Sequence, residues 1–210
     1  MFFMKTKKLT ALCMALVMTS VSAVSVYAAE ITNENPDGQT EVIAKINGVQ
    51  PGNVKYTIEI PDVVDFGDLS FPADTTVDNF KDVNFTLKLT ELEGLDPDSQ
   101  KIQVYVRDQD ATVDDYKDFT ITNKSNSSVS FNYDVYNVSG NAFNPDTSIN
   151  VDRGNMSSSA GFLYTQFSNL NEEVTGTLRL DQNQLAEYNL ENIVGDYSGY
   201  MVFYSKITSV

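Results

Sequence analysis

Apolar and polar residues alternate with a period of two along most of the chain beyond residue 50. In the first such run, Val54, Tyr56, Ile58 and Ile60 are separated by charged or hydroxyl residues. The same alternation recurs over 85–90, 102–107 and 129–136. Because successive side chains of a strand point to opposite faces, each run predicts a strand with one face toward a core and one toward water.

Six further segments are rich in β-branched and aromatic residues and predict additional strands. They cover 41–47, 66–71, 117–122, 161–167, 174–180 and 199–207. Turn-forming residues separate them, for example Asp96-Pro97-Asp98 and Asn144-Pro145-Asp146. About ten short strands with such punctuation predict an all-β fold, a β-sandwich of immunoglobulin-like or related type. One short helix is expected at 183–188, with Asp181 as its N-cap.

The N-terminal segment has the pattern of a secretory signal peptide. Lys5, Lys7 and Lys8 precede an apolar stretch over 9–26, and Ala28 supplies a small residue for cleavage. We therefore expect a signal peptide at 1–28, a flexible lead-in at 29–40 and one β-sandwich domain at 41–210. No later stretch has the roughly 20 apolar residues that cross a bilayer, so the sequence predicts a protein that is secreted or held non-covalently at the cell surface.

The balance of charges excludes several classes of ligand. The chain has 14 basic and 29 acidic residues, and three of the basic ones lie in the predicted signal peptide. Removing these three leaves 11 basic residues and a formal charge of −18. Nucleic acids and anionic membranes require basic surfaces, so neither is an expected partner.

The chain also lacks the residue types that most catalytic sites require. It has no histidine, and its single cysteine, Cys13, lies in the predicted signal peptide. This composition excludes histidine-dependent triads, histidine zinc sites and thiol chemistry in the mature chain. Glycoside hydrolysis needs only two carboxyl groups and stays open as an alternative.

A dense group of carboxylates suggests a calcium site, the one cofactor that the sequence predicts. The group consists of Asp108, Asp110, Asp114 and Asp115, with Asp118 nearby. Calcium prefers oxygen ligands of this kind, but Val113 and Phe119 stand where an EF-hand loop requires Gly and Glu. The alternative is a solvated acidic loop beside a strand.

Two tyrosines are candidate contact residues for a partner. Tyr105 and Tyr136 fall on the opposite phase from the apolar residues of their strands, which predicts that they are exposed. Exposed tyrosines are common in protein interfaces because they combine a large contact area with a polar tip. A second packed face of the sheet is the alternative.

Two stretches carry a resemblance to a known family. They are 56–69, which contains Ile60-Pro61-Asp62, and 195–204, which contains Gly195-Asp196-Tyr197-Ser198-Gly199. The pair is similar to small secreted β-sandwich surface proteins of Gram-positive bacteria, the WxL-like proteins, which associate non-covalently with the cell wall. The resemblance implies that Tyr197 is a corner tyrosine at the entry to the last strand. The chain has no tryptophan, so the motif that defines the family is missing.

Three functions follow as hypotheses. The first is a secreted, non-enzymatic bacterial surface or released binding protein, with a host protein such as an immunoglobulin or a cell-wall glycan as ligand. The second is a structural subunit of a surface layer or pilus, because sheet edges can accept a neighbour's strand. The third is a carboxylate-dependent glycoside hydrolase.

Overall fold

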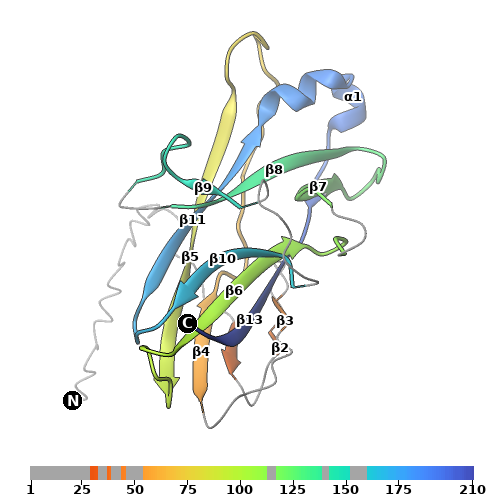
Figure 1. The fold of residues 1–210 in the computed structure, drawn as a ribbon. Helices are drawn as coiled ribbons and strands as arrows, with labels where there is room; N and C mark the ends of the chain where they lie inside the picture. Colours follow the sequence, from red (N-terminus) through yellow and green to blue (C-terminus); the bar gives the residue numbers. More distant parts are fainter. Residues whose placement is uncertain are drawn as a thin grey trace, which may run out of the picture.

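The computed structural model describes residues 29–32, 37–38, 44–45, 54–112, 117–138, 142–151 and 160–210. In this part of the chain the strands form two sheets that lie against each other (Figure 1). The predicted signal peptide lies outside the described residues. Among the described residues, no helix is long and apolar enough to cross a membrane.

The larger sheet carries the longest strand of the molecule near its centre. Its strands run in the order β1, β4, β5, β11, β8, β7 and β12, and β9 pairs with β8 beside this path. All of these neighbours are antiparallel. The bounds are β1 Ala29–Thr32, β4 Lys55–Ile60, β5 Phe80–Glu93, β7 Thr120–Asn123, β8 Ser130–Asn137, β9 Ile149–Asn150, β11 Glu173–Asp181 and β12 Tyr197–Ser198.

The smaller sheet is built around the C-terminal strand. Its order is β10, β6, β13, β3 and β2, and the pairing of β3 with β13 is parallel while the others are antiparallel. The bounds are β2 Asp37–Gly38, β3 Ala44–Lys45, β6 Gln100–Asp108, β10 Phe162–Phe167 and β13 Met201–Ser209.

The core lies between the sheets and consists of the residues that alternate along the strands. Leu87 and Leu89 of β5 and Ile102 and Val106 of β6 are fully buried in one hydrophobic cluster. Burying an aliphatic side chain of this size stabilises a fold by about 2 kcal/mol. The prediction of an all-β sandwich is confirmed, because the period-two pattern places these residues on facing inner surfaces.

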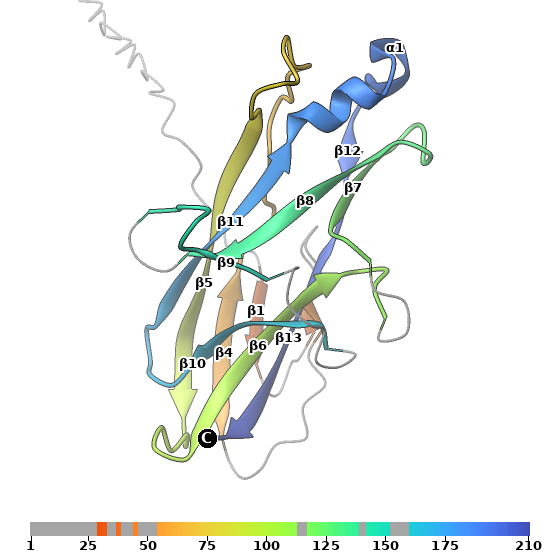
Figure 2. The same ribbon diagram turned by 45° about the horizontal axis from the view of Figure 1, so that its top comes forward.

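Two short helices connect β11 to β12. The first, η1, is a 3₁₀-helix at Gln182–Glu187, and the Asp181 side chain accepts a hydrogen bond from the Asn183 N–H as the predicted N-cap. The second, α1, spans Leu190–Ile193 and was not expected from the sequence. Figure 2 shows α1, β12 and β7 at one end of the sandwich, which we call the α1 end.

One expectation about local structure is wrong. Residues 66–71 are not a strand. Gly67 has a φ of 64°, and its N–H donates to the Asp65 carboxylate at 2.7 Å, so a side-chain turn interrupts the extended chain there. Within the predicted lead-in at 29–40, β1 pairs with β4 and β2 pairs with β3.

Candidate binding surfaces

The acidic group predicted to bind calcium is only partly within the described residues. Asp114 and Asp115 lie outside them. Asp108 is 5% exposed at the end of β6, and its carboxylate accepts N–H hydrogen bonds from Asp110 at 2.9 Å and from Thr120 at 3.3 Å. Burial raises the pKa of the Asp108 carboxyl, although these two N–H groups act in the opposite direction. This carboxyl therefore connects the end of β6 to the start of β7.

No group of three or more His, Cys, Asp or Glu side chains among the described residues is arranged to hold a metal ion. Asp110 and Asp118 are exposed on either side of the residues that are not described. Calcium binding by the whole group stays a prediction.

The expectation that Tyr105 and Tyr136 are exposed is wrong, because they are 5% and 6% exposed. The Tyr105 hydroxyl donates to Gln103 at 2.7 Å, and the Lys206 ammonium lies 4.8 Å from the centre of its ring. The Tyr136 ring packs edge-on against Phe143 at 5.0 Å. Side chains outside the core thus form a second packed layer, and a binding role for these tyrosines stays a prediction.

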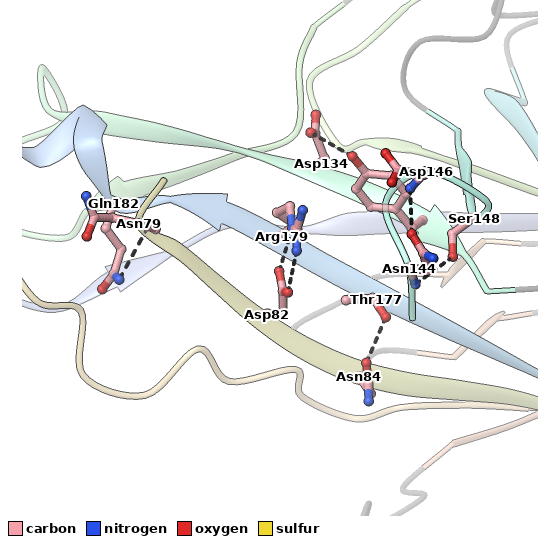
Figure 3. Close-up of polar contacts among 11 residues, drawn as sticks. Asn79, Asp82, Asn84, Asp134, Asn144, Asp146, Ser148, Thr177, Arg179 and Gln182 are labelled. Atoms are coloured by element: carbon pink, nitrogen blue, oxygen red, sulfur yellow. Dashed lines mark hydrogen bonds and ion pairs between the residues drawn. The ribbon is translucent and has the colours of Figure 1, made fainter. Parts of the chain in front are cut away.

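The outer face of β5, β11 and β8 carries a row of polar side chains, shown in Figure 3, which we call the polar face. Arg179 of β11 is at its centre. Its Nε and Nη2 atoms donate to the two carboxylate oxygens of Asp82 at 2.7 Å each. Its guanidinium contacts two rings, at 4.3 Å from the centre of Phe80 and 4.7 Å from that of Phe143. The hydrogen bond to Asp82 raises the pKa of Arg179, so this side chain stays charged.

Other polar groups of this face also bond to one another. Thr177 is fully buried, and its hydroxyl donates to the Asn84 side-chain oxygen at 2.7 Å. The Tyr136 hydroxyl donates to Asp134 at 3.4 Å. Because Phe143 belongs to the segment 142–151, its contacts with Arg179 and Tyr136 hold that segment against the sheet. The polar face therefore stabilises the fold and offers few uncommitted groups to a ligand.

A different surface lies at the α1 end, where a hollow of about 650 Å³ opens between the segment 63–71 and the residues around α1 and β12. We call it the apolar cleft. Its floor is the end of the hydrophobic core, with Phe66, Phe131, Leu178 and Met201 among its buried side chains. Four large apolar side chains around it are 43–72% exposed: Phe71, Val63, Leu190 and Val194.

The wall of the cleft beside α1 is fixed by the Gly-Asp-Tyr-Ser-Gly stretch. The Tyr197 hydroxyl donates to the Ile193 carbonyl at 2.6 Å, four residues upstream. Gly195 has a φ of 145°, and a side chain at Gly199 would collide with the Thr120 carbonyl oxygen. The predicted corner tyrosine is therefore confirmed, and its hydrogen bond connects α1 directly to β12.

Sequence reasoning missed the apolar cleft because its exposed residues lie outside the alternating strands. A usable signal was nevertheless present. Several apolar residues lie in segments that do not alternate with a period of two, so the sequence pattern does not assign them to the core. They are Val63, Val64, Leu190, Ile193 and Val194.

Comparisons with known proteins place the chain in no family. No protein-family model matches the sequence, and no curated protein matches it.

Among solved structures, one chain from a study of the chaperone–tip adhesin complex in the biogenesis of CFA/I fimbriae is 12% identical, with a TM-score of 0.42 over 74% of this chain. CfaE, the adhesive subunit of CFA/I fimbriae of enterotoxigenic Escherichia coli, is 14% identical, with a TM-score of 0.29 over 62% of this chain. Each alignment covers 41% of the matched chain, less than half of its length.

Proposed function

We propose that this protein is a secreted, non-enzymatic binding protein whose ligand is another protein that covers the apolar cleft. The observation that carries the proposal is the group of four exposed apolar side chains around one hollow of about 650 Å³. Exposed apolar side chains that gather in one place typically mark an interaction site. Removing such apolar surface from water is favourable and is the main driving force of most protein–protein association.

The position of these side chains favours a protein over a cell-wall glycan. Leu190 lies in the short helix α1 and Val194 is its C-cap, and both side chains are exposed at the rim of the cleft. A ligand that removes them from water must therefore cover the rim as well as fill the floor of the cleft. A glycan is usually bound by aromatic stacking and by polar side chains. Three of the four exposed side chains of the rim, Val63, Leu190 and Val194, are aliphatic, and the Tyr197 hydroxyl is committed to Ile193.

The sequence supplies the remaining support. The pattern of residues 1–28 supports export. The formal charge of −15 keeps the exposed apolar residues compatible with solubility, because copies of the chain repel one another.

A matched pair of double variants tests the proposal. Leu190→Ser with Val194→Ser removes two rim residues that are 57% and 72% exposed. Ile149→Ser with Val210→Ser removes two residues that are 60% and 71% exposed and do not line the cleft. Binding to a panel of host extracellular proteins, immunoglobulin included, and to purified cell-wall glycan is measured by surface plasmon resonance.

We expect saturable binding to a protein of the panel, lost in the rim variant and retained in the control variant. Equal binding by both variants, or binding to glycan alone, would overturn the proposal. Turnover of any substrate by the protein would also overturn it.

A further inference from the structure

The charged residues that line the apolar cleft are mostly acidic. Asp65 and Asp68 lie on the segment 63–71 at one wall, and Asp196 lies next to β12 at the other. Lys124 supplies the single cationic side chain of the lining. Both walls of the cleft therefore carry carboxylates beside an apolar floor.

Two of these carboxylates face solvent without a partner among the described residues. The hydrogen bonds of Asp68 and Asp196 are made by their main-chain carbonyls, to the Lys81 ammonium at 3.4 Å and to the Lys124 N–H at 2.9 Å. Both residues are exposed. Asp65 differs, because one of its carboxylate oxygens accepts the Gly67 N–H.

The charge of the cleft restricts what can enter it. A second copy of this chain brings a formal charge of −15 and is repelled, and anionic lipids are repelled for the same reason. A cationic ligand gains attraction from both walls, and this attraction raises its association rate. An apolar group is needed in addition, because the floor of the cleft is the end of the hydrophobic core.

We propose that the apolar cleft binds a polypeptide segment in which an apolar block is flanked by lysine or arginine residues. This inference rests on the proposed function and specifies its ligand class. The apolar block contacts the floor and the rim, and the flanking cations lie beside Asp68 and Asp196. Charge determines which apolar segments are accepted, since hydrophobic contact alone does not discriminate among them.

Three synthetic peptides test the inference with the secreted form of the protein, from which residues 1–28 are removed. The first has the block Leu-Phe-Val-Leu flanked on each side by two lysines. The second has glutamates in place of the lysines, and the third keeps the lysines but replaces the block with serines. Binding is measured by isothermal titration calorimetry at about 0.15 M salt, where long-range attraction is largely screened.

We expect the first peptide to bind with a dissociation constant at least tenfold lower than that of either other peptide. The third peptide is the control for general attraction of cations to an acidic protein. If it binds as tightly as the first, the cleft does not select an apolar block and the inference is wrong.

A second comparison locates the charges that matter. Asp68→Asn with Asp196→Asn neutralises the two free carboxylates of the cleft. Glu93→Gln with Asp98→Asn neutralises two exposed carboxylates around the turn between β5 and β6, at the end of the sandwich opposite α1 (Figure 2). We expect the cleft pair to weaken binding of the first peptide at least fivefold and the distant pair to change it less than twofold. Equal effects of the two pairs would overturn the inference.

The experiment separates this inference from the proposed function. If the glutamate peptide binds as tightly as the lysine peptide, and Leu190→Ser with Val194→Ser abolishes both, the cleft is a binding site but the charge selection is wrong. If that rim variant binds the panel protein and the first peptide as well as the original protein does, both proposals fail.

Discussion

The polar face and the apolar cleft differ in how completely their side chains are used by the fold. On the polar face, Arg179 is hydrogen-bonded twice to Asp82 and contacts two aromatic rings, and the Thr177 hydroxyl is hydrogen-bonded to Asn84. At the cleft, Leu190 and Val194 are mostly exposed, and the carboxylates of Asp68 and Asp196 have no partner among the described residues.

This difference shows which surface is available for a ligand. A polar group that already has a hydrogen-bond partner must lose that bond before it can bind another molecule. Ligand binding to a face whose polar groups are all paired is therefore disfavoured. An exposed apolar side chain loses only its contact with water, which is favourable. The charged and aromatic side chains of the polar face therefore serve the fold, and the cleft is the surface that we propose for binding.

The comparison predicts its largest effect on stability beneath the polar face. Gly176 is on the inner side of β11, where a side chain would collide with the Phe85 ring and the Tyr164 hydroxyl. We expect Gly176→Ala to lower the free energy of unfolding by about 3 kcal/mol, measured by urea denaturation. Adding Tyr164→Phe removes one of the two obstacles and should restore part of the loss. Unchanged stability of Gly176→Ala would show that β11 does not rest rigidly on the core.

Arg179→Met tests the polar face directly. Methionine retains most of the apolar length, but the Asp82 ion pair and the two cation–ring contacts are lost. Because the pair is partly exposed, we expect a loss of about 1.5 kcal/mol in denaturant unfolding. Lys101→Met on β6 removes a cation from the other sheet and is the control. If Arg179→Met leaves the free energy of unfolding unchanged but abolishes ligand binding, the polar face is a binding surface and its contrast with the cleft is wrong.

Thr177→Val separates a hydrogen bond from packing at the same face. Valine has nearly the same shape, so the variant loses the bond to Asn84 and little else. We expect a decrease of about 1 kcal/mol, measured by thermal and urea unfolding together. The neighbouring substitution Thr175→Val, on the same face of β11, should have a smaller effect. If both variants lose the same stability, the loss comes from placing valine in β11 and not from the missing hydrogen bond to Asn84.

The smallest effect on stability is predicted at the rim of the cleft. Leu190→Ser with Val194→Ser should change the free energy of unfolding by less than about 0.5 kcal/mol, because exposed side chains contribute little to the fold. Differential scanning calorimetry measures this directly. A loss as large as that of Arg179→Met would mean that these residues stabilise α1, and the contrast between the two surfaces would disappear.

The sequence was sufficient to predict the parts of the fold that repeat a simple pattern. Leu87, Leu89 and Ile102 are buried as their alternation predicts, and Asp181 caps η1 as its type and position predict. Tyr197 is the corner tyrosine that the resemblance implied. Each of these features depends on neighbours within a few residues or on one repeated period.

Features that depend on distant segments could not be predicted in this way. Tyr136 is buried because Phe143, which lies in the segment after β8, packs against it. The alternation of residues along β8 cannot predict that contact. The apolar residues of segment 66–71 are typical of a strand and predict one, whereas a turn at Asp65 and Gly67 directs them to the cleft. The cleft exists only because that segment and α1 meet at one end of the sandwich.

The last part of the chain has a mechanical consequence. Residues 197–209 supply β12 to the larger sheet and β13 to the smaller one, and Gly199 lies against Thr120 where the chain crosses between them. Sliding one layer past the other would load both sets of pairings at once, in shear along β13. A pull applied to β13 would thus also load the β12 pairing and, through Tyr197, the hydrogen bond that joins β12 to Ile193 of α1.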